Sequence, residues 1–369
     1  SGNSLQTVRA DIKNGSDTVA VGTFGSSLLV SGSSFGVRYG LQAIDIVGDL
    51  TISESGSFSA KISSTSGTGS LTVSAGENLT LTGENDYTVA TMVTGILTAD
   101  KKALGNTKSL TISNGGQFIN AGANEVGELE SSGKMTLNAL LTVTNDQDGE
   151  SHVSGTLAGN GGLMINSGSL VSTAVSEPTS GYTGTVTLGT SDTDAHLTLE
   201  AAAGAQIGSG TIEFANADSS LTINTSGASV LGNLLSGVGQ VTVSGTNGES
   251  FAFKKGQEGK DIDFAGTLTL TNVEYDFTTD ANDILNDVSL TVNNGTTLVL
   301  NKADDTATRK INGMSLNGGR IDFGTIGNGS GHIDLQGQSL STSTVADTTF
   351  SLETDLADRQ DASGSAAFD

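Results

Sequence analysis

Carboxylate side chains in short runs are the residues of this sequence best suited to binding chemistry. A complete calcium loop needs oxygen ligands at fixed spacings and a bidentate glutamate at its end, and neither of the two best runs has a glutamate at the right distance. We expect solvated turn residues here, with weak calcium binding as the alternative, and we predict no metal and no cofactor. The two runs contain Asn145, Asp146, Asp148 and Glu150, and Asp192 with Asp194.

Few residues of this sequence are arranged in a way that suits nucleophilic catalysis. Residues 32–36 spell G-x-S-x-G around Ser34, but hydrolases carry that motif between a strand and a helix, and both flanks here have strand patterns. The histidines His152, His196 and His332 are isolated in sequence, and the chain has no cysteine. We therefore predict no catalytic residue and no enzymatic activity.

Basic side chains gather once. Lys254, Lys255 and Lys260 are close in sequence, and Arg309 and Lys310 follow. If the chain forms stacked coils, these side chains come together as a positive patch. Such a patch would bind a sulfated glycan or an acidic protein segment. The alternative is a solvated loop neutralised by neighbouring carboxylates.

Composition excludes several partners. The chain has 369 residues, 16 lysines and arginines against 40 acidic residues, and a formal net charge of −24. Nucleic acid and anionic membrane surfaces are excluded, because both need clustered cations. No apolar run reaches the roughly 18 residues that a spanning helix requires.

Apolar and polar residues alternate with period two from end to end, which is typical of strands with one buried and one wet face. An ordinary globule of 369 residues would have a thick aromatic core, but tryptophan is absent and aromatics are only 4%. A thin stack of coils of about 20–25 residues needs only medium-sized side chains. We predict one all-β domain, 1–369, with excursion loops near 84–106, 173–184, 246–263 and 276–287. The clearest strand patterns are at 71–74, 110–113, 221–224, 241–244 and 290–293.

Stacked coils would align short polar side chains in outward ladders. Such a ladder suits lateral pairing between identical chains, because many weak contacts in register add up. The net charge opposes this pairing unless salt screens it. The candidate rungs are Asn145, Asp146, Asp148, Asp192, Asp194, Asp218, Thr222 and Asn224.

Three stretches, 69–116, 161–212 and 239–295, repeat one order of features, including a short apolar turn before a strand. They resemble the repeat of Gram-negative autotransporter passengers of the self-associating adhesin class. Residues 79–88 with 103–106 match one copy, and 159–163 with 182–188 and 207–212 match another. The first copy has Val89 where that repeat has glycine, and the third is degraded around Leu285.

The resemblance implies a right-handed, three-sided parallel β-helix exported through the outer membrane and displayed on the cell surface. An outer-membrane barrel of the same precursor normally follows. Neither it nor a signal peptide is in this sequence, so we expect a processed or truncated passenger.

Three functions follow from these observations. The first is a non-enzymatic adhesin that pairs with the identical passenger on neighbouring cells, in aggregation, biofilm formation or virulence. The second is an adhesin for a host glycosaminoglycan or a matrix protein such as fibronectin. The third, a β-helix enzyme that degrades polysaccharide, is disfavoured because neither an aromatic sugar platform nor a catalytic set is present.

Overall fold

The computed structural model describes residues 11–14, 17–21, 35–36, 43–46, 49–52, 55–59, 61–64, 67–145, 149–173, 181–201, 207–253, 263–276, 285, 287–299, 308–322, 332–335, 338, 340–342 and 349–351. Their regular structure is entirely β. No helix in these ranges has the length and hydropathy needed to cross a membrane. The chain divides into two compact units: unit 1 is Ser1–Leu197 with Ile207–Thr211, and unit 2 is Thr198–Gln206 with Ile212–Asp369.

Unit 1 is built from short strands. They are β1 (Asp11–Asn14), β2 (Asp17–Val21), β3 (Phe35–Gly36), β4 (Ala43–Asp45), β5 (Asp49–Ile52), β6 (Gly56–Phe58), β7 (Lys61–Ser63), β8 (Ser70–Val73), β9 (Asn78–Leu81), β10 (Ala90–Val93), β11 (Ile96–Ala99), β12 (Thr107–Ile112), β13 (Gln117–Asn120), β14 (Asn124–Ser131), β15 (Lys134–Leu137), β16 (Leu141–Val143), β17 (Glu150–Val153), β18 (Thr156–Gly159), β19 (Leu163–Ile165), β20 (Gly168–Ser172) and β21 (Val186–Leu188).

Two strands, β22 (Ala195–Ala201) and β23 (Thr211–Phe214), contain residues of both units. Unit 2 contains two longer strands among its short ones. Its strands are β24 (Ser220–Thr225), β25 (Ser229–Leu231), β26 (Leu234–Phe253), β27 (Asp263–Asp276), β28 (Val288–Asn293), β29 (Thr297–Val299), β30 (Thr308–Lys310), β31 (Met314–Asn317), β32 (Arg320–Asp322), β33 (His332–Asp334), β34 (Leu340–Thr342) and β35 (Thr349–Ser351).

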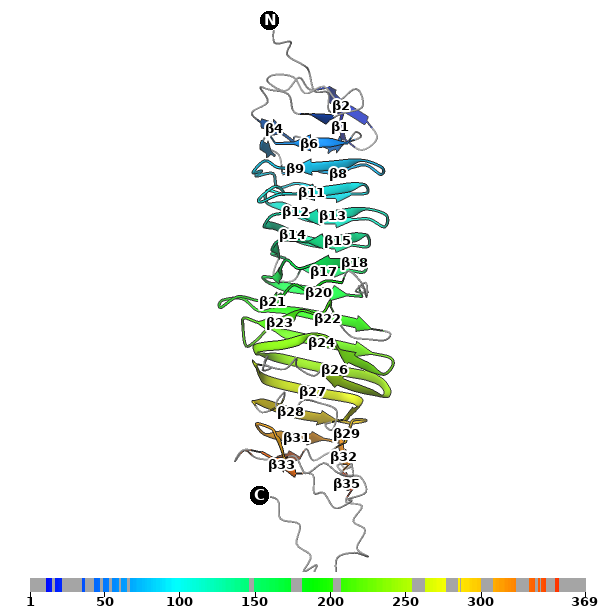
Figure 1. The fold of residues 1–369 in the computed structure, drawn as a ribbon, viewed down its shortest axis with the longest axis vertical. Helices are drawn as coiled ribbons and strands as arrows, with labels where there is room; N and C mark the ends of the chain where they lie inside the picture. Colours follow the sequence, from blue (N-terminus) through cyan, green and yellow to red (C-terminus); the bar gives the residue numbers. More distant parts are fainter. Residues whose placement is uncertain are drawn as a thin grey trace, which may run out of the picture. The chain divides into compact units, whose positions relative to one another are not determined.

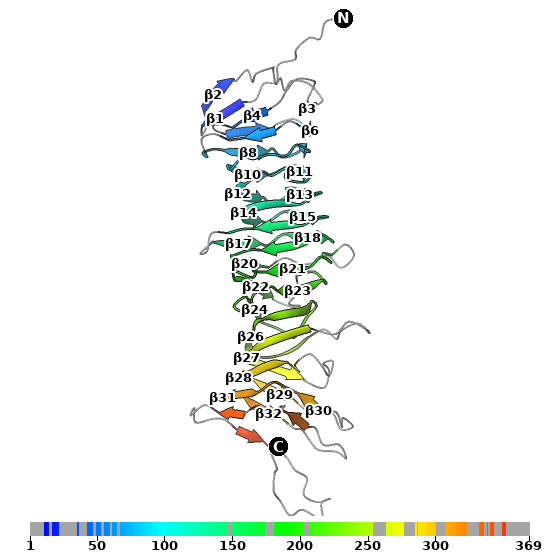
Figure 2. The ribbon, with the colours of Figure 1, turned by 90° about the vertical axis from the view of Figure 1, so that its left-hand side faces the viewer.

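The strands of unit 1 stack in parallel, one coil above the next (Figure 1). Thr91 pairs with Leu110 and Leu110 with Leu129, so each of these coils takes 19 residues. A seven-stranded sheet, β3-β6-β9-β11-β13-β15-β18, runs beside this series (Figure 2). The described exceptions here are β1, which pairs antiparallel with β2 and β5, and an isolated antiparallel bridge between Ala158 and Gly181.

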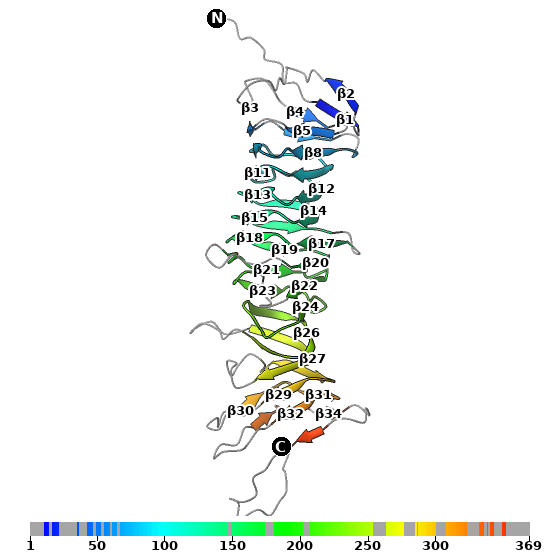
Figure 3. The same cartoon turned by 90° about the vertical axis from the view of Figure 1, so that its right-hand side faces the viewer.

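Unit 2 stacks in the same way (Figure 3). The described pairings of β24, β26, β27, β28, β31 and β34, in that order, are all parallel. Its coils are more variable in length: Leu221 pairs with Val241 after 20 residues, and Val241 pairs with Leu268 after 27. The all-β parallel solenoid predicted from the sequence is therefore confirmed, whereas its right-handed, three-sided form stays a prediction.

Inward side chains of successive coils stack on one another and form the core. In the second sheet of unit 1, the side chains of one such column are at most 1% exposed: Leu79, Leu97, Phe118, Met135 and Leu157. Each side chain contacts the coils above and below, so medium-sized residues suffice to exclude water. This explains why a chain without tryptophan buries its interior.

In two copies of the sequence repeat, a buried tyrosine makes the same contact with a glycine of the next coil. Tyr87 and Tyr182 are fully buried, and a glycine of the next coil, Gly105 or Gly208, packs against the backbone of each tyrosine. Both glycines have positive φ, +59° and +71°, and an added Cβ would lie 2.8 Å from Tyr87 N or 2.1 Å from Tyr182 O. Glycine is needed at both positions for φ and for space.

The expected excursion at 84–106 is instead part of the coil stack. This segment contains β10 and β11, which pair in register with strands on both sides, because its alternating residues Tyr87, Val89, Val93 and Leu97 are buried. Residues 246–253 of a second expected loop belong to β26. Most of the remaining expected loop residues, 174–180, 254–262 and 277–284, lie outside the described residues.

Candidate functional site

An uninterrupted column of hydroxyl side chains runs along the outward face of unit 2. Strand pairing places these residues directly above one another on six successive strands, and all are partly or fully exposed. β-Branched threonine has few rotamers, so the hydroxyls are held in a regular row about 4.8 Å apart. We call this column the hydroxyl ladder: Thr222, Thr242, Thr269, Thr291, Ser315 and Ser341.

Uncharged polar residues flank the hydroxyl ladder on both sides. The column toward the strand starts contains Ser220, Gln240, Thr267 and Ser289. The column toward the strand ends is linked by side-chain hydrogen bonds, since Asn293 Nδ2 donates to Thr271 Oγ1 (3.0 Å) and Asn317 Nδ2 to Asn293 Oδ1 (3.4 Å). At the far end of this column, Asn224 Nδ2 donates to Glu200 Oε1 at 2.6 Å.

The corresponding outward column of unit 1 has mixed chemistry. It begins with threonines but continues through a methionine that is 40% exposed, a carboxylate, an imidazole and a valine. We call it the mixed ladder: Thr51, Thr72, Met92, Thr111, Glu130, His152 and Val171.

A histidine bridges two carboxylates on the mixed ladder. His152 Nδ1 lies 2.9 Å from Glu130 Oε1 on the preceding coil, and His152 Nε2 lies 3.1 Å from Glu150 Oε1 on its own strand. Glu150 and His152, two residues apart on a strand, share one face, which the sequence alone indicates. Glu130 is 22 residues away, so its place beside His152 depends on the coil register, which sequence reasoning did not give.

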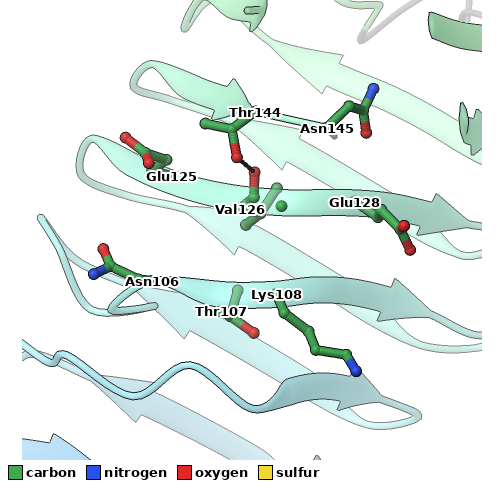
Figure 4. Close-up of a pocket in the computed structure, with 9 residues that line it drawn as sticks. Asn106, Thr107, Lys108, Glu125, Val126, Glu128, Thr144 and Asn145 are labelled. Atoms are coloured by element: carbon green, nitrogen blue, oxygen red, sulfur yellow. Dashed lines mark hydrogen bonds between the residues drawn. The ribbon is translucent and has the colours of Figure 1, made fainter. Parts of the chain in front are cut away.

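A shallow groove of about 240 Å³ crosses three coils of unit 1 beside the mixed ladder (Figure 4). The strand β14 changes pairing partner along its length: Val126 pairs with β16, whereas Ser131 pairs with β17. Gly127 allows close approach of the coils, because an added Cβ would lie 2.1 Å from the carbonyl oxygen of Lys108. The groove is lined by Asn106, Thr107, Lys108, Glu125, Val126, Gly127, Glu128, Thr144 and Asn145.

The charged side chains of the groove do not converge on one point. Figure 4 shows Glu125 and Glu128 on opposite sides of Val126, pointing away from each other. The side chain of Asn145 is only 5% exposed and fully engaged: its Nδ2 donates to Ser169 O (2.9 Å) and its Oδ1 accepts from Ser151 Oγ (2.7 Å). Asn145 therefore stabilises the coil corner instead of presenting an amide to a ligand.

The other residues proposed from the sequence are dispersed. Asp192, Asp194 and Asp218 are exposed turn residues outside both ladders, and Asp194 pairs with His196 at 3.2 Å. Lys310 is exposed on β30, which also contains the backbone of Arg309. Asp146, Asp148, Lys254, Lys255 and Lys260 lie outside the described residues.

Thr222 and Asn224 are the proposed rungs that do lie on stacked columns. Among the residues that the structure describes, no three His, Cys, Asp or Glu side chains are arranged to hold a metal ion. Comparison of the chain with protein-family models, with curated proteins and with solved structures finds no significant match.

Proposed function

We propose that this chain is a non-enzymatic adhesin of a bacterial cell surface that associates with identical chains through the hydroxyl ladder of unit 2. The observation that supports this is the unbroken column from Thr222 to Ser341, with uncharged polar columns beside it. Export through the outer membrane of a Gram-negative cell belongs to the same proposal and rests on the sequence resemblance.

Charge favours this surface over others for pairing. Two chains that each carry a net charge of −24 repel. Docking along the hydroxyl ladder brings mostly hydroxyls and amides together, and the carboxylate of Glu200 lies at one end of the flanking column, on Asn224. Each hydroxyl contact is worth little in water, but contacts repeated along the ladder add because the first fixes the register of the rest.

Sedimentation velocity over a concentration series at low and high salt tests the proposal. We expect reversible dimers that are stronger at high salt, where the repulsion is screened. Thr269→Arg should weaken the dimer, because a long charged side chain interrupts the ladder at its centre. Thr111→Arg, on the mixed ladder of unit 1, adds the same charge and is the matched control. Monomers at every concentration and salt level, or equal loss in both variants, would contradict the proposal.

A further inference from the structure

The turn 113–116 joins β12 to β13 at a corner of unit 1 and has an Asn–Gly pair at its tip. The turn is closed by a hydrogen bond from Gly116 N–H to Ser113 O (2.8 Å). Gly115, its third residue, has a φ of +86°, as a type II turn requires. Asn114 and Gly115 are both exposed, and a Cβ added to Gly115 would meet no atom within 4 Å. The tip of this turn is therefore open to solvent.

An asparagine followed by glycine reacts with its own backbone without an enzyme. The glycine backbone nitrogen attacks the asparagine Cγ and gives its proton to water, while the side-chain nitrogen takes up a proton from water and leaves as ammonia. Water then opens the resulting succinimide ring to aspartate or isoaspartate. Glycine favours the attack because it has no side chain in the way. Hydrogen bonds at either residue slow the reaction, because they must break before the nitrogen reaches Cγ.

Three other Asn–Gly pairs are restrained through their backbone. Gly161 N–H, the attacking group of the pair at 160–161, donates to Leu137 O at 2.8 Å. The carbonyl oxygens of Asn294 and Asn312 accept hydrogen bonds of 3.3 and 2.8 Å from residues of the preceding coil. The pairs of which the structure describes both residues begin at Asn114, Asn160, Asn247, Asn294, Asn312 and Asn317.

Two more pairs are restrained through the asparagine side chain. Asn247 Nδ2 donates to Glu249 Oε1 at 3.3 Å, and Asn317 Nδ2 donates to Asn293 Oδ1 at 3.4 Å. By contrast, no described hydrogen bond involves either residue at the tip of the 113–116 turn. This tip is thus the described Asn–Gly pair whose backbone and side chain are both unrestrained.

We propose that Asn114 is a site of spontaneous deamidation in the folded chain, and that it reacts ahead of the other described Asn–Gly pairs. The inference does not depend on the proposed function. Its isoaspartate product routes the backbone through the former side chain, so one extra methylene enters the turn. Gly116 has no room to move aside, since an added Cβ there would lie 2.3 Å from Val93 O. The longer turn therefore disrupts the hydrogen bond between Gly116 and Ser113.

Incubation of the full chain at pH 8, followed by peptide mapping with mass spectrometry, tests the site. Asn160 is the matched control, because it is also exposed and followed by glycine, but the N–H of Gly161 is hydrogen-bonded. We expect Asn114 to convert about tenfold faster, the ratio that one such hydrogen bond supplies. In denaturant the two sites should convert at similar rates. Both should slow at pH 6, because the attacking nitrogen must lose its proton.

Asn114→Gln should abolish the fast conversion, because glutamine would have to close a larger ring. Equal rates at Asn114 and Asn160 in the folded chain, or the same rate difference in denaturant, would overturn the inference.

Hydrogen exchange of the Gly116 N–H tests the effect on the turn. The matched control is Asn114→Asp, which carries the charge of the products on an ordinary backbone. We expect faster exchange in the isoaspartate form than in this variant. Equal exchange in the two would contradict the disruption of the turn.

Discussion

The outward columns of units 1 and 2 occupy the same kind of position on parallel strands but carry different chemistry. In unit 2 the hydroxyl ladder runs without interruption from Thr222 to Ser341. In unit 1 the mixed ladder changes from threonine to Met92 and then to the Glu130–His152 pair. The inward columns do not differ in this way, since both units stack Leu, Val, Ile and Phe.

This difference separates the two roles of a coil. The inward residues fix the register and are confined to apolar side chains of suitable volume, whereas the outward residues are free to vary. A surface function can therefore change from one unit to the other without any change of fold. The following predictions test whether the cores of the two units are stabilised in the same way and whether the units differ only in their outward residues.

The largest effect is expected from truncating core leucines. Leu129→Ala in unit 1 and Leu268→Ala in unit 2 each remove a fully buried side chain and should destabilise the surrounding coils by about 2–5 kcal/mol. Hydrogen exchange of the adjacent strands measures the loss in each unit. Similar losses would indicate that the two cores are stabilised in the same way, whereas a loss in only one unit would contradict this.

Glycines with positive φ should differ according to their surroundings. Gly105 of unit 1 and Gly248 of unit 2 both have positive φ, but only Gly105 lies against a neighbouring coil, at Tyr87. Gly248→Ala should cost about 1 kcal/mol for its backbone conformation, and Gly105→Ala about 1–3 kcal/mol more for the close approach. Chemical denaturation of the two variants tests this. Equal losses would mean that the contact with Tyr87 is unimportant.

A threonine-to-valine substitution should cost more stability at a buried position than at an outward one. Thr91 of unit 1 is fully buried, and its hydroxyl bonds to Tyr87 Oη and Thr107 Oγ1, both at 3.0 Å. Thr91→Val should cost about 1–2 kcal/mol, because it leaves buried hydroxyls short of partners. Thr269→Val on the hydroxyl ladder should stay within about 0.5 kcal/mol. Thermal unfolding of both variants, with Thr111→Val as the outward control in unit 1, checks this.

The smallest effects are expected from pH, and they should have opposite signs in the two units. In unit 2, the backbone N–H of Asn247 and the hydroxyl of Thr246 lower the pKa of Glu249 to about 2 from its ordinary 4.5. The contribution of Glu249 to folding stability is therefore complete above pH 4.5 and is lost as the pH falls toward 2. In unit 1, the hydrogen bond with Glu130 raises the pKa of His152, which makes its contribution complete at low pH and lost as the pH rises through that value.

Hydrogen exchange around residues 246–249 and 150–153, as a function of pH, measures these two contributions. Glu249→Gln should remove the protection from exchange that is lost in acid. His152→Gln should remove the protection that is lost on raising the pH. The same pH response in both segments would contradict the assignment.

The strands were predictable because alternation is a local property. The expected strand patterns at 71–74, 110–113, 221–224, 241–244 and 290–293 correspond to β8, β12, β24, β26 and β28. The sequence predicts an excursion at 84–106 because polar turn residues interrupt the alternation there, although Tyr87 and Val89 belong to a buried column.

The site was less predictable, because it depends on which residues lie one coil apart. That separation varies from 19 to 27 residues, so no fixed period identifies the partners. The sequence pattern indicates Thr222 as a rung but does not indicate Thr242, Thr269 and Thr291, the next three residues of the ladder. Glu130 and His152 meet for the same reason, although each residue alone is unremarkable in sequence.

The parallel stacking also bears on how the chain reaches this structure. Each described coil pairs with the coils directly before and after it, through residues about 20 positions away. A newly formed coil therefore offers a complete edge to the next segment of chain, so growth can proceed one coil at a time after a single costly nucleation step. In this view the order in which segments of the chain become available to pair, not the final stability of each coil, decides which coils form first.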